Sequence, residues 1–160
     1  MSERIEQAVE LYRQGHNCAQ ALLVAFGESC GLDRDTSQKL ALGLGGGLGK
    51  TGEICGAANG ACILLGQDTG EQEDPFGKQA QKKAQKRVRE FLRAFKKECG
   101  AVTCRDLVGS DIATRLGMAE AVGKRAFVRN CPQYVEIAAR ILDGMLGSGN
   151  GDGQGPDQKS

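Results

Sequence analysis

The sequence predicts an all-α protein, a single-domain helical bundle of about five to seven helices. Apolar residues recur at helical spacing along most of the 160 residues, and no run of alternating β-branched residues indicates a strand. A hydrophobic content of 40% is enough for one core, and 26% charged residues argue against general disorder. We expect a helical domain over residues 1–146 and a flexible, polar tail over residues 147–160.

Three helices are expected in the first part of the chain. The first ends before Gly15, the second begins after Asn17, and the third runs from about Asp35 to Leu44. Apolar side chains at helical spacing require packing against other helices. In the first two helices these side chains are Ile5, Ala8, Val9, Tyr12, Leu22, Leu23 and Phe26.

A glycine-rich loop follows and is the most unusual local feature. Eight glycines lie between Gly43 and Gly60. The short helix after this loop is apolar on most sides, which predicts burial at the centre of the bundle. Its apolar residues are Ala57, Ala58, Ala61, Ile63, Leu64 and Leu65.

The longest helix is expected to begin at Asp74-Pro75, which supply a cap and a first-turn proline, and to end at Gly100. Two or three shorter helices follow, and the last begins near Cys131-Pro132. The inward stripe of the longest helix consists of Phe76, Ala80, Ala84, Val88, Phe91, Leu92 and Phe95. The last helix carries Tyr134, Ile137, Ala138, Ile141, Leu142 and Met145.

Charge is distributed unevenly along the chain. The formal net charge is only +1, but nine basic residues and one acid, Glu90, lie between Lys78 and Lys97. That helix therefore carries +8, and the remainder of the chain carries about −7, since 1 − 8 = −7. The basic positions alternate with the inward stripe and have no aromatic residues among them, so we interpret them as a solvated face and expect no nucleic-acid partner.

The N-terminal sequence and the cysteine count bear on the cellular compartment. The first six residues are charged rather than apolar, and no run approaches the roughly 18 apolar residues that span a bilayer. We expect a cytoplasmic protein without membrane insertion. Cytoplasmic thiols are normally reduced, so the seven cysteines suggest metal binding, redox chemistry or burial rather than a disulfide framework.

Four cysteines are candidates for chemistry, because a helix N-terminus stabilises a thiolate. Cys18, Cys104 and Cys131 each follow a capping Asn or Thr, with an amide or acid three residues after the cap. Cys55 leaves the glycine-rich loop just before the central helix. The other three are expected at helix C-termini or inside an apolar helix and are interpreted as packing residues: Cys30, Cys62 and Cys99.

The arrangement of these cysteines resembles a known family. Residues 17–21 read Asn-Cys-Ala-Gln-Ala, residues 55–60 read Cys-Gly-Ala-Ala-Asn-Gly, and single cysteines follow at positions 104 and 131. Over residues 5–145 this pattern resembles the C_GCAxxG_C_C family of redox-active proteins. The resemblance implies a redox function carried by Cys18, Cys55, Cys104 and Cys131.

The same region resembles the iron–sulfur part of split-Soret cytochromes, which also carry covalent haem. No CxxCH attachment sequence is present, and the single histidine is His16. We therefore expect no covalent haem, and we interpret His16 as a surface or capping residue.

Four cysteine thiolates can hold an iron–sulfur cluster or a structural zinc ion. The four cysteines are separated by 37, 49 and 27 residues, with no CxxC pair, so tertiary folding must assemble any such site. We predict that their sulfurs meet in one pocket and hold an iron–sulfur cluster of undefined type for electron transfer or redox sensing. Glycines let the backbone approach a cofactor, and we assign Gly52, Gly56 and Gly60 to this role.

Two alternatives use the same cysteines. In a thiol–disulfide oxidoreductase, they would be catalytic, with one attacking and one resolving cysteine. In a zinc-stabilised helical module, they would be structural and the protein would not be an enzyme. The sequence leaves open whether the protein is an enzyme, which redox partner it uses, and whether it is a homodimer.

Overall fold

The computed structural model describes residues 2–69 and 77–149. Regular structure in these residues is helical apart from one isolated bridge between Ile54 and Thr103, which confirms the all-α prediction. The helices, numbered α1 to α9 with one 3₁₀ helix η1, outnumber the five to seven predicted. Some are too short to show an amphipathic period, since α8 has only 4 residues.

The N-terminal part of the bundle begins where the sequence predicts. Asn17 caps α2, because its side chain accepts a hydrogen bond from the Gln20 N–H at 2.8 Å while the Gln20 side chain accepts from the Asn17 N–H at 3.0 Å. The third helix stops at Leu40, four residues earlier than expected. The elements here are α1 (Glu3–Arg13), α2 (Cys18–Phe26), η1 (Glu28–Cys30) and α3 (Arg34–Leu40).

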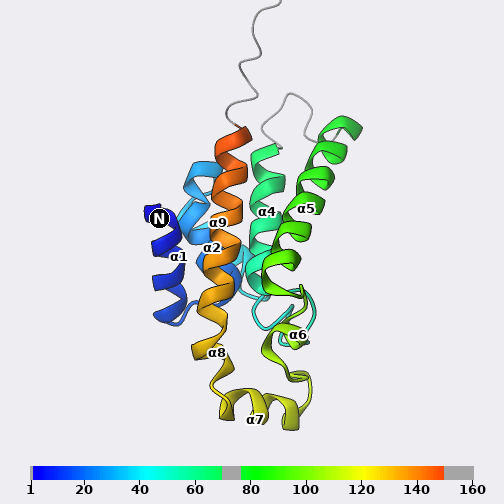
Figure 1. The fold of residues 1–160 in the computed structure, drawn as a ribbon. Coiled ribbons are helices and arrows are strands. Elements are labelled where there is room, and N and C mark those ends of the chain that lie inside the picture. The colour runs from blue at the N-terminus through cyan, green and yellow to red at the C-terminus, as the bar shows by residue number, and fades with distance from the viewer. Residues whose placement is uncertain (1, 70–76, 150–160) are drawn as a thin grey trace, which may run out of the picture.

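Helix α4 (Gly56–Thr69) is the central buried helix that the sequence predicts. It packs against α2, α5 and α9 (Figure 1). The contact with α2 is close, because a Cβ added at Gly60 would lie 3.1 Å from the Ala19 carbonyl oxygen. A small residue at this position lets the two helix backbones approach each other.

Helices α5 (Lys78–Cys99) and α9 (Cys131–Gly149) complete the main bundle (Figure 1). Gly100 ends α5 in the left-handed conformation, with φ 86°, as expected. The start expected at Asp74-Pro75, and Phe76, lie outside the described residues. Helix α9 continues to Gly149, so the boundary predicted at residue 147 is three residues too early. Residues 150–160 lie outside the described part.

A second, smaller apolar cluster lies below the main bundle in Figure 1. It is formed largely by three short helices. Together with α9, four helices follow α5 in the described part of the chain, one more than the two or three expected there. Helix α7 crosses the lower end of the molecule between the other two. These elements are α6 (Cys104–Val108), α7 (Arg115–Gly123) and α8 (Ala126–Arg129).

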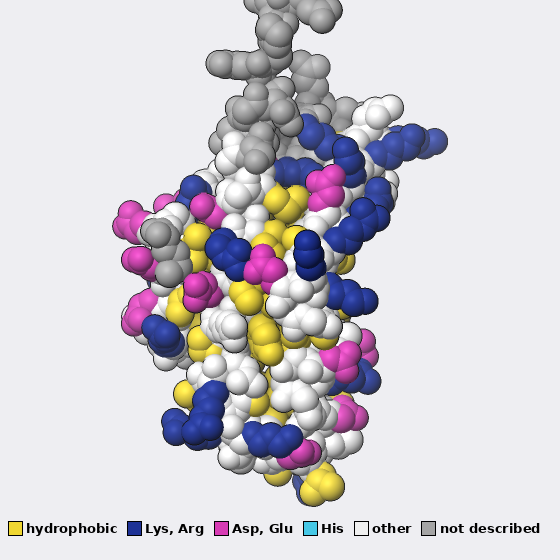
Figure 2. Space-filling model, viewed as in Figure 1, with side chains coloured by type: hydrophobic (Ala, Val, Ile, Leu, Met, Phe, Trp, Pro, Cys, Tyr) yellow, Lys and Arg dark blue, Asp and Glu magenta, His cyan; other side chains and the backbone are white. Residues whose placement is uncertain are grey.

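The surface reflects the uneven charge of the sequence. Figure 2 shows Lys and Arg side chains along α5, on the side that faces away from the bundle. The buried side of α5 consists of Ala80, Phe91 and Phe95, and the two aromatic rings stack with centroids 5.9 Å apart. Among the described residues, no helix combines the length and apolar character that a membrane span requires.

Candidate four-cysteine redox site

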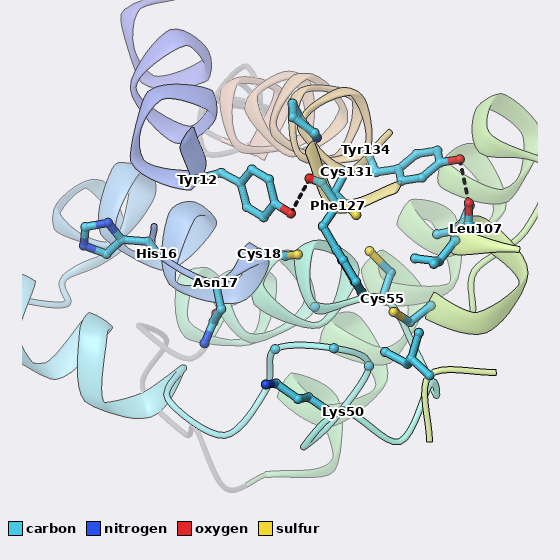
Figure 3. Close-up of a pocket in the computed structure, with 18 of the residues that line it drawn as sticks. Tyr12, His16, Asn17, Cys18, Lys50, Cys55, Leu107, Phe127, Cys131 and Tyr134 are labelled. Atoms are coloured by element: carbon cyan, nitrogen blue, oxygen red, sulfur yellow. Dashed lines mark hydrogen bonds between the residues drawn. The ribbon is translucent and has the colours of Figure 1, made fainter. Parts of the chain in front are cut away.

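A cavity of about 800 Å³ lies where the N-terminal ends of α2, α4, α6 and α9 meet the glycine-rich loop (Figure 3). Its lining includes Cys18, Cys55, Cys104 and Cys131. These are the four cysteines selected from the sequence, and the prediction that they share one pocket is confirmed. The other three cysteines, Cys30, Cys62 and Cys99, do not line this cavity.

Local capping explains how the sulfurs reach the cavity. Cys18 and Cys104 are the first residues of α2 and α6, after the N-cap residues Asn17 and Thr103. Cys55 directly precedes α4, and its N–H donates to the Val102 carbonyl oxygen at 2.8 Å. A side chain at the first position of a helix lies beside the free N–H groups of that helix.

The capping arrangement expected at Asn130 is wrong. Asn130 has helical backbone angles, with φ −101° and ψ −43°, so the chain passes from α8 into α9 without an extended N-cap residue. Cys131 is still the first residue of α9. Here the turn of α8, rather than a cap, aims the sulfur at the cavity.

The pKa values of Cys18 and Cys131 are linked by an interaction between the two thiols. The Tyr12 hydroxyl interacts with Cys131 and donates to the Phe127 carbonyl oxygen at 2.7 Å. The interaction with Cys18, followed by the interaction with Tyr12, lowers the pKa of Cys131 against the effect of burial. The pKa of Cys18 is raised well above its ordinary value by its interaction with Cys131, by burial and by neighbouring thiols.

Burial governs the remaining two thiols. It raises the pKa of Cys55 to about 11, although the N–H groups of Ala57 and Ala58 act in the opposite direction. It also raises the pKa of Cys104 to about 12, with further contributions from Cys55 and Cys131. The expectation that each helix start lowers the pKa of its cysteine is therefore wrong. The pKa is lowered only at Cys131, where Cys18 and Tyr12 lower it, and the pKa values of the other three cysteines are raised, by Cys131 and burial at Cys18 and mainly by burial at Cys55 and Cys104.

Apart from the thiols and His16, the ionisable groups with a formal charge that line the cavity are basic side chains. Arg13 and Lys50 are the only Lys, Arg, Asp or Glu side chains among the described residues that line it. Figure 3 shows Lys50 on the glycine-rich loop, opposite Tyr12 and Cys131. The rest of the lining is largely apolar and includes Leu107, Val108, Ile112, Met118 and Phe127. Such a cavity favours an anionic group near the sulfurs.

The glycine-rich loop forms a left-handed turn along one wall. Five consecutive residues, Gly46 to Lys50, have φ between 60° and 69°. Leu48 and Lys50 carry side chains in this conformation, which costs about 1–2 kcal/mol per residue. Gly47 must be small, because an added Cβ would lie 2.7 Å from the Cys104 Cβ and 2.6 Å from the Glu53 carbonyl oxygen. The wall is therefore backbone that approaches the cysteines closely.

Gly45, Gly46 and Gly47 of the glycine-rich loop line the cavity. The N–H groups of Gly45, Gly46 and Gly47 donate to no acceptor among the described residues, while the N–H groups of residues 48–53 are all bonded within the turn. These three glycines are not among those predicted to approach a cofactor, although a run of three glycines at positions 45–47 is a visible signal in the sequence. Tyr12, Arg13 and Lys50 are likewise cavity residues that the sequence pattern does not predict.

The three glycines that were predicted to approach a cofactor fall in different environments. Only Gly56 lines the cavity, where an added Cβ would lie 3.2 Å from the Cys18 Cβ. Gly52 faces Arg105, and Gly60 contacts α2, so these two assignments are corrected to packing roles. His16 lies at the cavity edge with its ring turned away from the sulfurs, and its Nδ1 is 3.1 Å from the Leu11 carbonyl oxygen (Figure 3).

The spacing of the sulfurs bears on which group could bind. Among residues 2–69 and 77–149, no three His, Cys, Asp or Glu side chains are arranged to hold a single metal ion. A zinc ion with Zn–S bonds of about 2.3 Å would need sulfurs that nearly touch one another. Iron–sulfur clusters distribute their cysteine ligands over several metal atoms.

The fold and cavity define a small helical protein in which four cysteines from distant segments converge. Residues 16–145 match the family model described as "Putative redox-active protein (C_GCAxxG_C_C)". The chain belongs to this redox-active family, in agreement with the resemblance seen in the sequence. Comparisons with curated proteins and with solved structures gave no match.

Proposed function

We propose that Cys18, Cys55, Cys104 and Cys131 hold an iron–sulfur cluster and that the protein transfers electrons or senses redox state. The observation that carries this proposal is the convergence of the four thiols on one cavity. A dithiol enzyme needs only two of them, whereas a cluster uses all four. When bound, the cluster would accept and release an electron.

The electrostatics of the cavity support this assignment. Four thiolates and a cluster carry net negative charge, which Arg13 and Lys50 would offset. The free N–H groups of Gly45, Gly46 and Gly47 would donate to sulfur and raise the reduction potential. The apolar lining limits water near the sulfurs, which strengthens both effects.

The raised thiol pKa values fit the same proposal. Mutual repulsion and burial keep Cys18, Cys55 and Cys104 protonated at neutral pH. Iron would replace these protons and supply the positive charge that the thiolates lack. The cavity is then most stable when the metal is bound.

The test is anaerobic purification or reconstitution, followed by iron, sulfide and zinc analysis and visible absorption. We expect iron and sulfide together, with visible absorption that decreases on reduction. The variant Cys104→Ser should lose most of the iron, whereas the matched control Cys62→Ser should keep it, because Cys62 lies outside the cavity. A colourless protein without iron after anaerobic reconstitution, or equal iron in both variants, would contradict the proposal.

The interaction between the Cys18 and Cys131 thiols, which lowers the pKa of Cys131 within their shared cavity, favours a second candidate, thiol–disulfide exchange. The Cys131 thiolate would attack a disulfide substrate, releasing one thiolate and forming a mixed disulfide. Cys18 would lose its proton to solvent and attack the Cys131 sulfur, releasing the second thiolate. Two electrons pass to the substrate, and the protein retains a Cys18–Cys131 disulfide.

Mass spectrometry after brief alkylation at mildly acidic pH tests the second candidate. Cys131 should be labelled before the other cysteines, because it alone has a lowered pKa. Oxidation by a small disulfide should then link Cys18 to Cys131. Uniform slow labelling, or a disulfide that involves other residues, would reject this candidate without affecting the iron analysis.

A further inference from the structure

Three of the six large exposed apolar side chains among the described residues line the cavity. In the described residues the six occur only in segments 40–48 and 116–128, and none lies on α1, α4, α5 or α9. They are Leu40, Leu42, Leu48, Leu116, Val122 and Val128. Single exposed hydrophobic residues are common, but a grouping beside a site marks an interaction surface.

Three of these side chains form part of the cavity wall itself. Leu42, Val122 and Val128 line the cavity and are also 66%, 59% and 62% exposed. A side chain can line the cavity and also be exposed only where the cavity opens to solvent. The opening is therefore edged with apolar side chains contributed by the end of the α3 turn, by α7 and by α8.

The charged groups at this opening are cationic. Arg13 and Lys50 line the cavity, and neither forms an ion pair with a described residue. Arg115, Arg125 and Arg129, which flank the exposed valines along α7 and α8, are also exposed and form no such pair. The acid in α7, Glu120, is already paired with Lys124 at 2.6 Å.

We propose that this opening is a docking surface for an acidic redox partner protein. The docking surface consists of Arg13, Leu42, Lys50, Val122 and Val128. An apolar centre with a charged edge is the usual composition of a specific protein interface, and an edge of one sign selects a partner of the opposite sign. The inference rests on the proposed redox role of the cavity, because the partner would lie directly over the four sulfurs.

Charge also argues against a second copy of this chain on the same surface. A symmetric dimer would place Arg13 and Lys50 of one copy near those of the other, and like charges across an interface are costly. Helix α5 is a second cationic surface, but its outward side carries no large exposed apolar residue. It lacks the apolar centre that a specific interface requires.

Binding of a fluorescently labelled acidic ferredoxin, used as the probe, tests the proposal in the full chain. We expect binding that weakens several-fold between about 20 and about 200 mM salt. Val128→Ser and Arg13→Gln should each raise the dissociation constant by about three- to tenfold. Arg89→Gln, the matched control on exposed α5, should leave it unchanged, and a basic cytochrome c should not bind.

Three results would overturn the proposal. One is absence of ferredoxin binding by a folded protein at low salt. The second is loss of binding in Arg89→Gln but not in Arg13→Gln, which would place the acidic partner on α5. The third is a dimer, measured by sedimentation, that Val128→Ser dissociates. Iron and sulfide content of Val128→Ser is measured in parallel, so a failure of docking is distinguishable from a failure of the cluster proposal.

Discussion

The thiols of Cys18 and Cys131 line the same cavity and shift each other's pKa, although 113 residues separate them in the chain. Each is the first residue of its helix, Cys18 of α2 and Cys131 of α9. The protonation state of each thiol affects the pKa of the other, so a substitution at one cysteine changes the pKa of its neighbour.

Removal of Cys18 should make Cys131 less acidic. The Cys18→Ala variant loses the interaction that is the largest cause of the lowered Cys131 pKa, so this pKa should rise. Alkylation of Cys131 near neutral pH should then slow, as followed by peptide mass spectrometry. Cys18→Ser retains a hydroxyl donor and should slow the reaction less. Equal rates in all three proteins would contradict the assigned interaction.

The reduced, metal-free protein should lose stability at high pH. Burial raises the pKa of Cys55 from 9.0 to about 11, so its contribution is present below pH 9, where both states are protonated. As pH rises from about 9 to about 11, the unfolded chain ionises first and stability falls by about 3 kcal/mol. Urea unfolding measured across this range checks the sign, and Cys55→Ala should flatten the dependence.

Gly47→Ala should disrupt the left-handed turn. The new Cβ would meet the backbone of Glu53 and the Cys104 Cβ at a residue with φ 69°, so we expect a loss of about 2–4 kcal/mol. Gly43→Ala is the matched control, because nothing lies within 4 Å of its added Cβ. The free energy of unfolding in urea measures both. Equal stability of the two variants would refute the packing described for this wall.

Two glycines in α4 should respond to alanine in opposite ways. Gly60→Ala places a Cβ 3.1 Å from the Ala19 carbonyl oxygen and should destabilise the α2–α4 contact by about 1–3 kcal/mol. Gly66→Ala meets nothing within 4 Å and should stabilise the protein by about 0.5–1 kcal/mol through helix propensity. Thermal or urea unfolding distinguishes them, and a stabilised Gly60→Ala variant would show that the contact can relax.

The sequence predicts the site's cysteines better than it predicts their chemistry. The Asn17 cap and the apolar helix after Cys55 are local patterns, so the start of α2 and the burial of α4 could be predicted. The left-handed turn could not, because Leu48 and Lys50 adopt positive φ only within hydrogen bonds such as that from the Gly49 N–H to the Gly43 carbonyl oxygen.

The pKa values of the cysteines depend on tertiary contacts, which the sequence pattern does not contain. The pKa of Cys104 follows from burial and from Cys55 and Cys131, whose distances from it are set by tertiary packing. Gly60 could not be placed from the sequence for the same reason. It is the last residue of the motif at residues 55–60, but it packs against Ala19 of α2 and does not line the cavity.

The placement of the cysteines has a consequence during biosynthesis. Because α9 contributes the last sulfur and α2 the first, a ribosome-bound chain that has emerged only as far as α6 holds three of the four thiols. Acquisition of any group that needs all four must wait until α9 has docked. If the proposed cluster is the group bound, a chain truncated before α9 would lack Cys131 and could not hold it through all four cysteines.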